Sequence, residues 1–137
     1  IFVSEAGSYR AAKNVEDKIA ELAQGGMSHQ QAELKGVEEF AVECSILKVF
    51  VSDITQQAAD EGIQIYGGMG FSADAPMEAT WRDARIGRIY EGTNEINRLL
   101  AVGMLIKKAM KGELDLLSPA MAISKELMGI PSFETPD

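Results

Sequence analysis

The stretch that decides the fold lies at residues 64–98 and reads QIYGGMGFSADAPMEATWRDARIGRIYEGTNEINR. It contains a glycine-rich turn, then a charged segment, then a glutamate-glycine-threonine corner. Each of these features has an ordinary structural explanation when it is taken alone. Their order and spacing together indicate that the function of the chain should be sought here.

Outward from this stretch, apolar residues recur at intervals of three and four, which is typical of amphipathic helices. One such stripe starts at Val3 and ends before Gly25 and Gly26. A longer stripe starts at Val37 and runs to Gly67, where glycine favours termination of a helix. The pattern therefore predicts two long helices before the glycine-rich turn.

Helix-start signals predict two shorter helices. Ser28 followed by Gln31 fits a capping box, which predicts a helix that begins there and ends near Gly36. Asp74 and Pro76 fit the N-cap and the first-turn proline of a helix through the charged segment.

The C-terminal part predicts two more helices. One begins near Thr93 and ends before Gly112, with lysines in its last turn, and the other begins at Ser118 and is closed by Gly129 and Pro131. There is no convincing strand, fixed-period repeat or low-complexity segment. The sequence therefore predicts an all-α fold in which helices pack side by side as a bundle.

Composition narrows the function classes. The 137 residues, 46% hydrophobic and 25% charged, suit one ordinary globular domain, and the net charge of −8 argues against a nucleic-acid surface. Cys44 is the only cysteine and His29 the only histidine, so neither a disulfide nor a Cys/His metal site is expected, and His29 is expected to be a surface residue.

No membrane span or signal peptide is visible, so a soluble protein of a reducing, intracellular compartment is expected. Both ends, from Ile1 to Asp137, suggest an excerpt of a longer protein.

The glycine-rich turn has two interpretations. Gly67, Gly68 and Gly70 could let backbone amides approach a phosphate. Alternatively they only end a helix, which is the simpler explanation because a phosphate-binding turn usually precedes a helix.

The charged segment also has a simple explanation. Arg82, Asp83, Arg85 and Arg88 lie on one short helix and would by default form a solvated, salt-bridging face. Trp81 is expected to pack in a core or an interface rather than to serve as a platform for a cofactor.

Glu91 differs because it lies on a corner between two helices, beside Tyr90 and Gly92. A corner can direct a carboxylate into a cavity, where apolar surroundings can turn an acid into a general base. Apolar surroundings destabilise the ionised carboxylate, whereas the dipole at the start of the following helix stabilises it by about 0.3–1 kcal/mol. The alternative, that Glu91 merely caps the next helix, is left open by the residues themselves.

Three blocks of the quoted stretch resemble the C-terminal α-helical domain of the acyl-CoA dehydrogenases in content and order. They are QIYGGMGF, RDARI and IYEGT, and the similarity is densest between Val37 and Leu105. The resemblance implies a flavoenzyme that converts an acyl-CoA thioester to a trans-2-enoyl-CoA. It implies that Glu91 takes the α-proton while the β-hydrogen leaves as hydride to FAD, and that Tyr90 and Gly92 line the acyl pocket. It also implies that the Glu91 backbone amide polarises the thioester carbonyl.

The resemblance implies FAD contacts in two segments. The first would touch the adenosine pyrophosphate of a neighbouring subunit's FAD and comprises Gln64, Ile65, Tyr66, Gly67 and Gly68. The second opens the following helix and comprises Thr93, Asn94 and Glu95. Several relatives carry glutamine in place of Glu95, and a glutamate there would repel a phosphate.

The resemblance also sets expectations for the whole protein. Residues 1–112 would be a partial dehydrogenase C-terminal domain, residues 27–36 an insertion, and residues 113–137 the start of an extension similar to the very-long-chain branch. The fragment alone is expected to be inactive. The complete protein is expected to be a homo-oligomer, a dimer or tetramer, that passes electrons to an electron-transferring flavoprotein in a bacterial cytoplasm or a mitochondrial matrix. The alternatives are an acyl-CoA oxidase and a non-catalytic helical assembly module.

Overall fold

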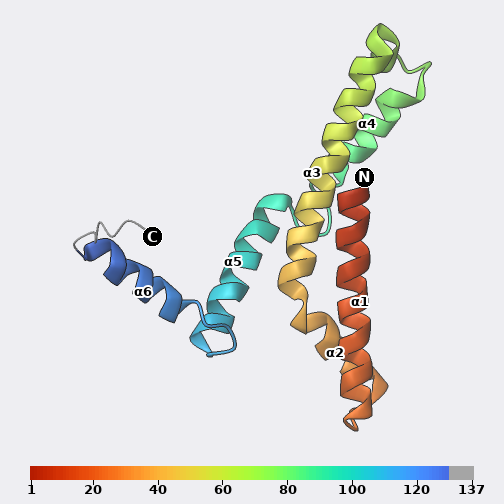
Figure 1. The fold of residues 1–137 in the computed structure, drawn as a ribbon. Coiled ribbons are helices and arrows are strands. Elements are labelled where there is room, and N and C mark those ends of the chain that lie inside the picture. The colour runs from red at the N-terminus through yellow and green to blue at the C-terminus, as the bar shows by residue number, and fades with distance from the viewer. Residues whose placement is uncertain (130–137) are drawn as a thin grey trace, which may run out of the picture. The chain divides into compact units, whose positions relative to one another are not determined.

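The computed structural model describes residues 1–129 and contains helices joined by turns (Figure 1). No strand occurs in these residues, so the predicted all-α class is confirmed. None of the helices in residues 1–129 is long and apolar enough to cross a bilayer. In chain order the elements are α1 (Phe2–Gln24), α2 (His29–Glu39), α3 (Ala41–Tyr66), the 3₁₀ turn η1 (Gly67–Phe71), α4 (Pro76–Ile86), α5 (Asn94–Met110) and α6 (Leu117–Met128).

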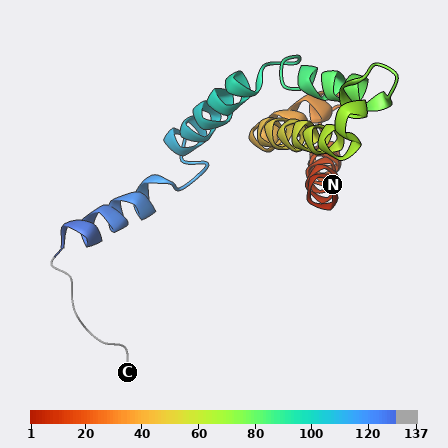
Figure 2. The same ribbon diagram turned by 90° about the horizontal axis from the view of Figure 1, so that it is seen from above.

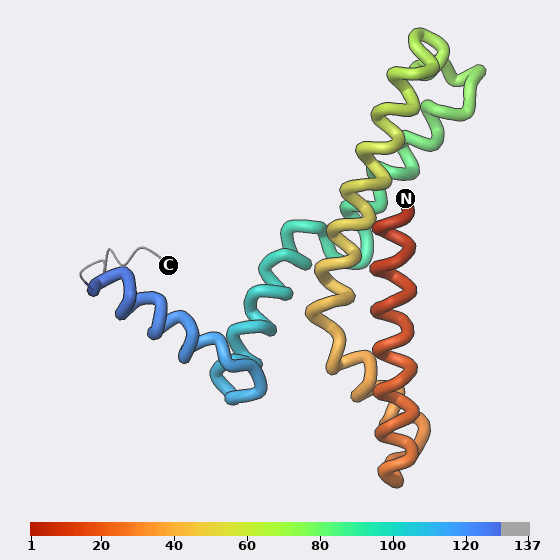
Figure 3. The backbone as a smooth tube through the Cα atoms, viewed as in Figure 1, coloured from red at the N-terminus to blue at the C-terminus, as the bar shows by residue number. Residues whose placement is uncertain are grey.

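The chain divides into two compact units, residues 1–102 and residues 103–137, and α5 begins in the first and ends in the second. In the first unit, α1 and α2 form a hairpin and α3 then runs back along α1 (Figure 3). After η1 the chain reverses again, so that α4 packs beside the end of α3 (Figure 2). The site described below lies in this unit.

Small residues form the core of the first unit. The buried apolar side chains are Ala11, Ala32, Val42, Ala59, Ala84 and Ala101. Larger apolar side chains remain exposed, among them Tyr9 at 76%, Ile65 at 82% and Phe71 at 84%. Residues 1–129 therefore leave extensive apolar surface uncovered by their own packing.

The second unit comprises the end of α5 and α6. The last turn of α5 contains Lys107 and Lys108, as predicted, and the backbone of Gly112 then adopts a φ of 76°. The α6 helix contains no buried residue, and it ends at Gly129 as predicted. Pro131 lies outside the described residues.

The predicted helix end at Gly36 is wrong, because α2 continues to Glu39 and α3 begins at Ala41. Gly36 is buried, and a methyl group added to it would lie 2.5 Å from the Ile19 side chain. This glycine therefore allows α2 to approach α1 closely, and the helix break falls at Phe40 instead.

Two predicted helix starts need adjustment. Ser28 is the N-cap of α2 but makes no side-chain capping bond, so the predicted capping box does not form. The N-cap of α4 is Ala75 and not the predicted Asp74, although Pro76 occupies the first turn as expected. The Asp74 backbone N–H donates instead to the Ser72 hydroxyl, 3.2 Å away, which stabilises the preceding turn.

Candidate functional site

The corner between α4 and α5 has an unusual backbone. Glu91 has a φ of 54° and is followed by Gly92 with a φ of 84°, so two consecutive residues are left-handed. Glu91 is the only residue other than glycine with a positive φ in residues 1–129. Such conformations cost about 1–3 kcal/mol and persist where the surrounding structure fixes them, often at functional sites.

Hydrogen bonds from two helices fix this corner. The Gly92 carbonyl accepts from Lys48 Nζ of α3 at 2.8 Å and from Asn97 Nδ2 of α5 at 2.9 Å. The Asn94 backbone N–H donates to the Arg88 carbonyl at 3.1 Å, which closes the loop on itself. The Gly92–Thr93 peptide is thus tied to both α3 and α5.

Asn94 forms the centre of this arrangement and is completely buried. Its side-chain oxygen accepts from Lys48 Nζ at 2.8 Å. Its amide nitrogen donates to Ser52 Oγ at 2.9 Å and to Asp53 Oδ1 at 3.0 Å. A buried amide with all of these partners holds the start of α5 against α3.

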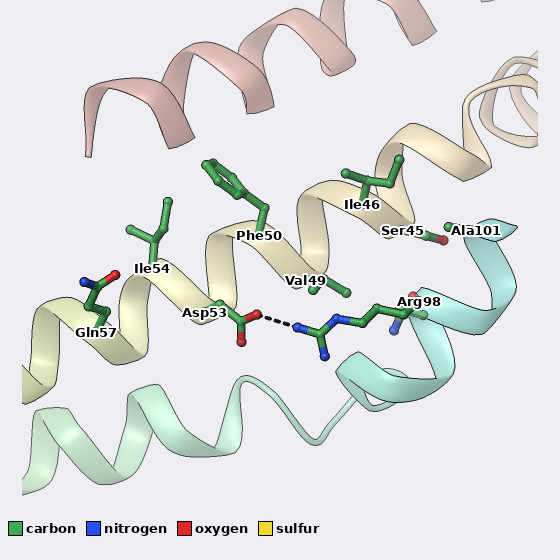
Figure 4. Close-up of a pocket in the computed structure, with 10 residues that line it drawn as sticks. Ser45, Ile46, Val49, Phe50, Asp53, Ile54, Gln57, Arg98 and Ala101 are labelled. Atoms are coloured by element: carbon green, nitrogen blue, oxygen red, sulfur yellow. Dashed lines mark hydrogen bonds and ion pairs between the residues drawn. The ribbon is translucent and has the colours of Figure 1, made fainter. Parts of the chain in front are cut away.

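Asp53 extends the arrangement to two arginines. Arg98 Nη2 donates to Asp53 Oδ2 at 2.8 Å, as Figure 4 shows. Arg88 Nε lies 2.8 Å from Asp53 Oδ1 as an ion pair, although its N–H direction does not meet hydrogen-bond geometry. We call Lys48, Ser52, Asp53, Arg88, Asn94, Asn97 and Arg98 the corner network.

A groove between α3 and α5 borders the corner network. Its volume is about 410 Å³, and Val49, Phe50 and Ile54 supply apolar side chains beside Asp53 and Arg98 (Figure 4). Glu91 does not line this groove. The groove therefore borders Asp53, Asn97 and Arg98 of the corner network, and the Glu91 carboxylate is not part of its lining.

Glu91, Tyr90 and Gly92 are all exposed in this chain. Among residues 1–129, the Glu91 backbone N–H has no hydrogen-bond acceptor. The corner therefore presents both a carboxylate and a free amide donor from the same residue.

The first turn of α5 is capped by Thr93 and not by Glu91. Thr93 Oγ1 accepts from the Ile96 backbone N–H at 3.3 Å. The pKa of Glu95 is lowered, mainly by a hydrogen bond from its own backbone N–H and then by one from the Thr93 hydroxyl. The helix N-terminus thus already holds one carboxylate, that of Glu95.

The first of the two segments predicted to contact FAD, Gln64 to Gly68, is exposed throughout. Gly67 ends α3 with a φ of 58°, and a methyl group added to Gly67 or Gly68 would meet nothing within 4 Å. Gly70 differs, because it is buried and packs directly on the Ile63 backbone. The turn therefore leaves two glycines open to a ligand and uses the third for packing.

The charged segment on α4 divides into two kinds of residue. Arg82 pairs with Glu78 at 2.8 Å on an exposed face, as the simple interpretation predicts. Arg88, in the turn after α4, instead reaches Asp53 of α3. Trp81 is half-buried, and its Nε1–H donates to Asp60 of α3, which fits the expected packing role.

His29 is exposed and lies 3.2 Å from Glu33, which agrees with the expected surface position. No group of His, Cys, Asp or Glu suited to hold a metal ion occurs in the part of the chain that the structure describes.

Sequence reasoning missed the α3 members of the corner network. Lys48 and Ser52 are four residues apart and lie outside the apolar stripe of α3, as does Asp53. Such spacing indicates only local neighbours on a helix, so it did not reveal their distant partners. Asn94 was predicted only as a cofactor contact, which stays a prediction, and its buried bonds give it a structural role as well.

Known proteins resemble this chain along most of its length. Residues 6–105 match the family model described as "Acyl-CoA dehydrogenase, C-terminal domain". The "Probable acyl-CoA dehydrogenase" of Bacillus subtilis (strain 168) is 41% identical over 128 residues, which are 93% of this chain and 22% of that protein. The human "Very long-chain specific acyl-CoA dehydrogenase, mitochondrial" is 40% identical over 98 residues, 72% of this chain and 13% of that protein.

A solved structure agrees with these similarities. The crystal structure of an acyl-CoA dehydrogenase complexed with FAD, from Bacillus anthracis, superposes with a TM-score of 0.82 at 42% identity. The match covers 98% of this chain and 23% of that one, so the chain spans less than a quarter of the length of these relatives. Sequence, fold and the family match agree, and the chain therefore belongs to the acyl-CoA dehydrogenase family, whose C-terminal domain its residues 6–105 match.

Proposed function

We propose that this chain is the C-terminal part of a longer FAD-dependent acyl-CoA dehydrogenase, in which Glu91 is the catalytic base. One observation carries the proposal: Glu91 has a left-handed backbone on an exposed corner that hydrogen bonds hold in place. A strained, well-supported acidic residue is what a positioned general base requires. A surface glutamate with no such task would not need this conformation.

In the proposed reaction, Glu91 removes the α-proton of an acyl-CoA thioester and its carboxylate becomes protonated. FAD, when bound, accepts the hydride that leaves the β-carbon, so that a trans-2-enoyl-CoA forms. The free N–H of Glu91 is available to donate to the thioester oxygen and to stabilise the charge that develops there. Tyr90 is exposed beside it and would line the acyl pocket together with Gly92.

The residues proposed to hold FAD suit such a ligand. Gly67 and Gly68 have open space where a side chain would lie, which leaves the backbone accessible to a pyrophosphate. Thr93 to Glu95 lie at the start of α5, where the helix dipole favours an anion. Glu95 fits less well, because its carboxylate would place a negative charge beside the phosphates.

We further propose that residues 1–112 form the dehydrogenase C-terminal domain and that residues 113–137 begin a C-terminal extension. The uncovered apolar surface of residues 1–129 supports the presence of other domains or subunits that cover it. The complete protein would be a homo-oligomer with shared FAD sites. It would pass its electrons to an electron-transferring flavoprotein, in a bacterial cytoplasm or a mitochondrial matrix.

The test uses the full-length protein that carries this chain, its Glu91→Gln variant and a matched control, Glu38→Gln, at an exposed position on α2. Each is mixed anaerobically with butyryl-CoA and palmitoyl-CoA, and the loss of flavin absorbance is followed. We expect the parent and Glu38→Gln to bleach with at least one substrate. Glu91→Gln should be slower by about 10³-fold or more, because the proton has no acceptor.

Two results would contradict the proposal. If the parent binds no flavin, the chain would instead belong to a non-catalytic helical module. If Glu91→Gln bleaches at the rate of the parent, another residue is the base. Oxygen consumption during aerobic turnover distinguishes an oxidase from a dehydrogenase that needs a flavoprotein acceptor.

A further inference from the structure

Lys48 is placed unusually for a lysine. It lies in the first half of α3 and is half-buried, whereas lysines on helices of this kind commonly extend into solvent. Its ammonium group is shared between the Gly92 carbonyl and the Asn94 side-chain oxygen, each at 2.8 Å. Both acceptors lie within three residues of Glu91 in the sequence.

These two bonds act on the backbone that sets the position of Glu91. The Gly92 carbonyl also accepts from Asn97 Nδ2, so donors from α3 and α5 converge on a single oxygen. Because the Gly92 carbonyl is fixed, the plane of the Gly92–Thr93 peptide is fixed as well. These bonds therefore restrict the left-handed backbone of Glu91 and Gly92 from its C-terminal side.

Apolar packing within the chain does not hold the corner. The large apolar side chains around it are exposed, with Ile89 at 46%, Tyr90 at 53% and Ile96 at 57%. The buried residues nearest in sequence are the polar Asn94 and Asn97. In residues 1–129 the conformation of the corner therefore depends on the corner network.

Within that network, Lys48 is the member that joins the corner itself to α3. Ser52 and Asp53 contact Asn94 and the arginines, but neither contacts the Gly92 carbonyl. An ammonium group is a strong donor to carbonyl oxygens because charge-assisted hydrogen bonds are about twice as strong as neutral ones. Loss of this one group would remove the bond from α3 to the Gly92 carbonyl, while the Asn97 bond to that carbonyl and the rest of the network stay in place.

We propose that Lys48 is a positioning residue for catalysis, which holds the Glu91 carboxylate where it can take the α-proton. This inference rests on the proposed function of Glu91. It predicts that removing the ammonium group slows proton removal while substrate and flavin remain bound. A purely structural lysine would instead affect folding and flavin content.

The test compares Lys48→Met and Lys48→Arg with the parent in the full-length flavoprotein. Lys13→Met is the matched control, because Lys13 pairs with Asp17 on the exposed face of α1. Flavin reduction is measured anaerobically in a single turnover, per bound flavin, with an ordinary acyl-CoA and with the same substrate dideuterated at the α-carbon. The substrate concentration is varied to separate binding from the reduction rate.

We expect Lys48→Met to reduce its flavin about 10- to 100-fold more slowly, since a displacement of about 1 Å can cost about 100-fold. The isotope effect of the α-deuterons should increase, because proton removal becomes more limiting. The half-saturating substrate concentration should change less than about twofold. Lys48→Arg should recover most of the rate because it retains a charged donor, and Lys13→Met should match the parent.

A per-flavin rate and isotope effect equal to those of the parent in Lys48→Met would overturn the inference, even if the variant melts earlier. If Lys48→Met does not fold, the same measurements on Lys48→Gln decide the matter, and parental values would again overturn it. Glu91→Gln is measured in parallel. If Glu91→Gln is inactive while Lys48→Met is normal, the positioning role alone fails; if Glu91→Gln is active, the proposed function fails and this inference fails with it.

Discussion

The two turns on either side of α4 both contain glycines, but they are held in different ways. In the turn before α4, Gly67 provides a left-handed backbone and Gly70 packs on the backbone of Ile63, a residue seven positions earlier. In the turn after α4, the shape depends on Gly92 and on side chains such as Lys48, which lies 44 positions away. The first turn is thus built from local backbone contacts and the second from distant polar side chains.

This difference suggests different tasks. A turn formed by its own backbone can stay open to a ligand on its other side, as Gly67 and Gly68 do. A turn tied by charged and amide groups can hold one side chain in a conformation that it would not adopt alone, as Glu91 does. Substitutions should therefore damage the two turns by different mechanisms.

The largest effect on structure is expected for Asn94→Leu. This change leaves Lys48 and Asp53 without their completely buried partner, which should cost about 3 kcal/mol locally. Hydrogen exchange followed by mass spectrometry should show the amides of residues 88–98 exchanging about 100-fold faster, while those of α1 are unchanged. Asn14→Leu on α1 is the control, because it makes the same change of side chain outside the corner network and should leave the exchange of residues 88–98 unchanged.

Parental exchange rates in Asn94→Leu would mean that polar side chains do not hold this corner, and the contrast between the turns would be lost. Faster exchange across all of residues 1–129 would show general destabilisation instead of release of one turn.

A smaller effect is expected for Gly70→Ala in the first turn. The added methyl group would lie 2.5 Å from the Ile63 carbonyl oxygen and 2.9 Å from its Cα, and backbone atoms cannot move aside as a flexible side chain can. Overpacking of this kind costs about 1–3 kcal/mol, so the melting temperature should fall. Gly68→Ala is the matched control, since its methyl group meets nothing within 4 Å.

Gly68→Ala should keep the parental melting temperature of the flavin-free protein but weaken flavin retention if the open face of the turn receives FAD. Equal melting temperatures for the two variants would refute the packing role of Gly70.

The sequence predicted the helices well because their signals are local. Apolar periodicity located α1 and α3, and Gly67 ended α3 as expected. One error involved a tertiary contact. Gly36 was predicted to end a helix, but it lies within α2, where it makes room for Ile19 of α1.

The same limit applies to the site. Glu91 and Gly92 could be selected because a distinctive local motif contains them, although the roles assigned to them stay predictions. Lys48 and Asp53 could not, since their partners lie at least 35 residues away (residue 53 to residue 88) and a helical pattern records only local spacing. Asn94 combines the two cases: the sequence shows its place in the motif, but only the structure shows that it is buried against α3.

The smallest effect concerns Glu95, at the start of the helix that follows the second turn. Its pKa is lowered in the folded chain, first by its own backbone N–H and then by Thr93, so its ionised form favours folding. That stabilisation is complete when the pH is above 4.5, the ordinary pKa of glutamate. It disappears as the pH falls through the lowered pKa of the folded chain. Flavin-free Glu95→Gln should therefore melt slightly below the parent at pH 7, and the difference should vanish in acid.

Although Glu95→Gln should lower the melting temperature, it should improve the retention of flavin. Glu95→Gln removes a negative charge from a helix start that is proposed to face a pyrophosphate, so FAD should dissociate a fewfold more slowly at low ionic strength, and less so in salt. Slower dissociation together with a lower melting temperature would place Glu95 beside the phosphates and show that it stabilises its own helix at the expense of the cofactor. Unchanged dissociation would separate the start of α5 from the pyrophosphate, and the open glycine turn before α4 would then be the remaining candidate for that contact.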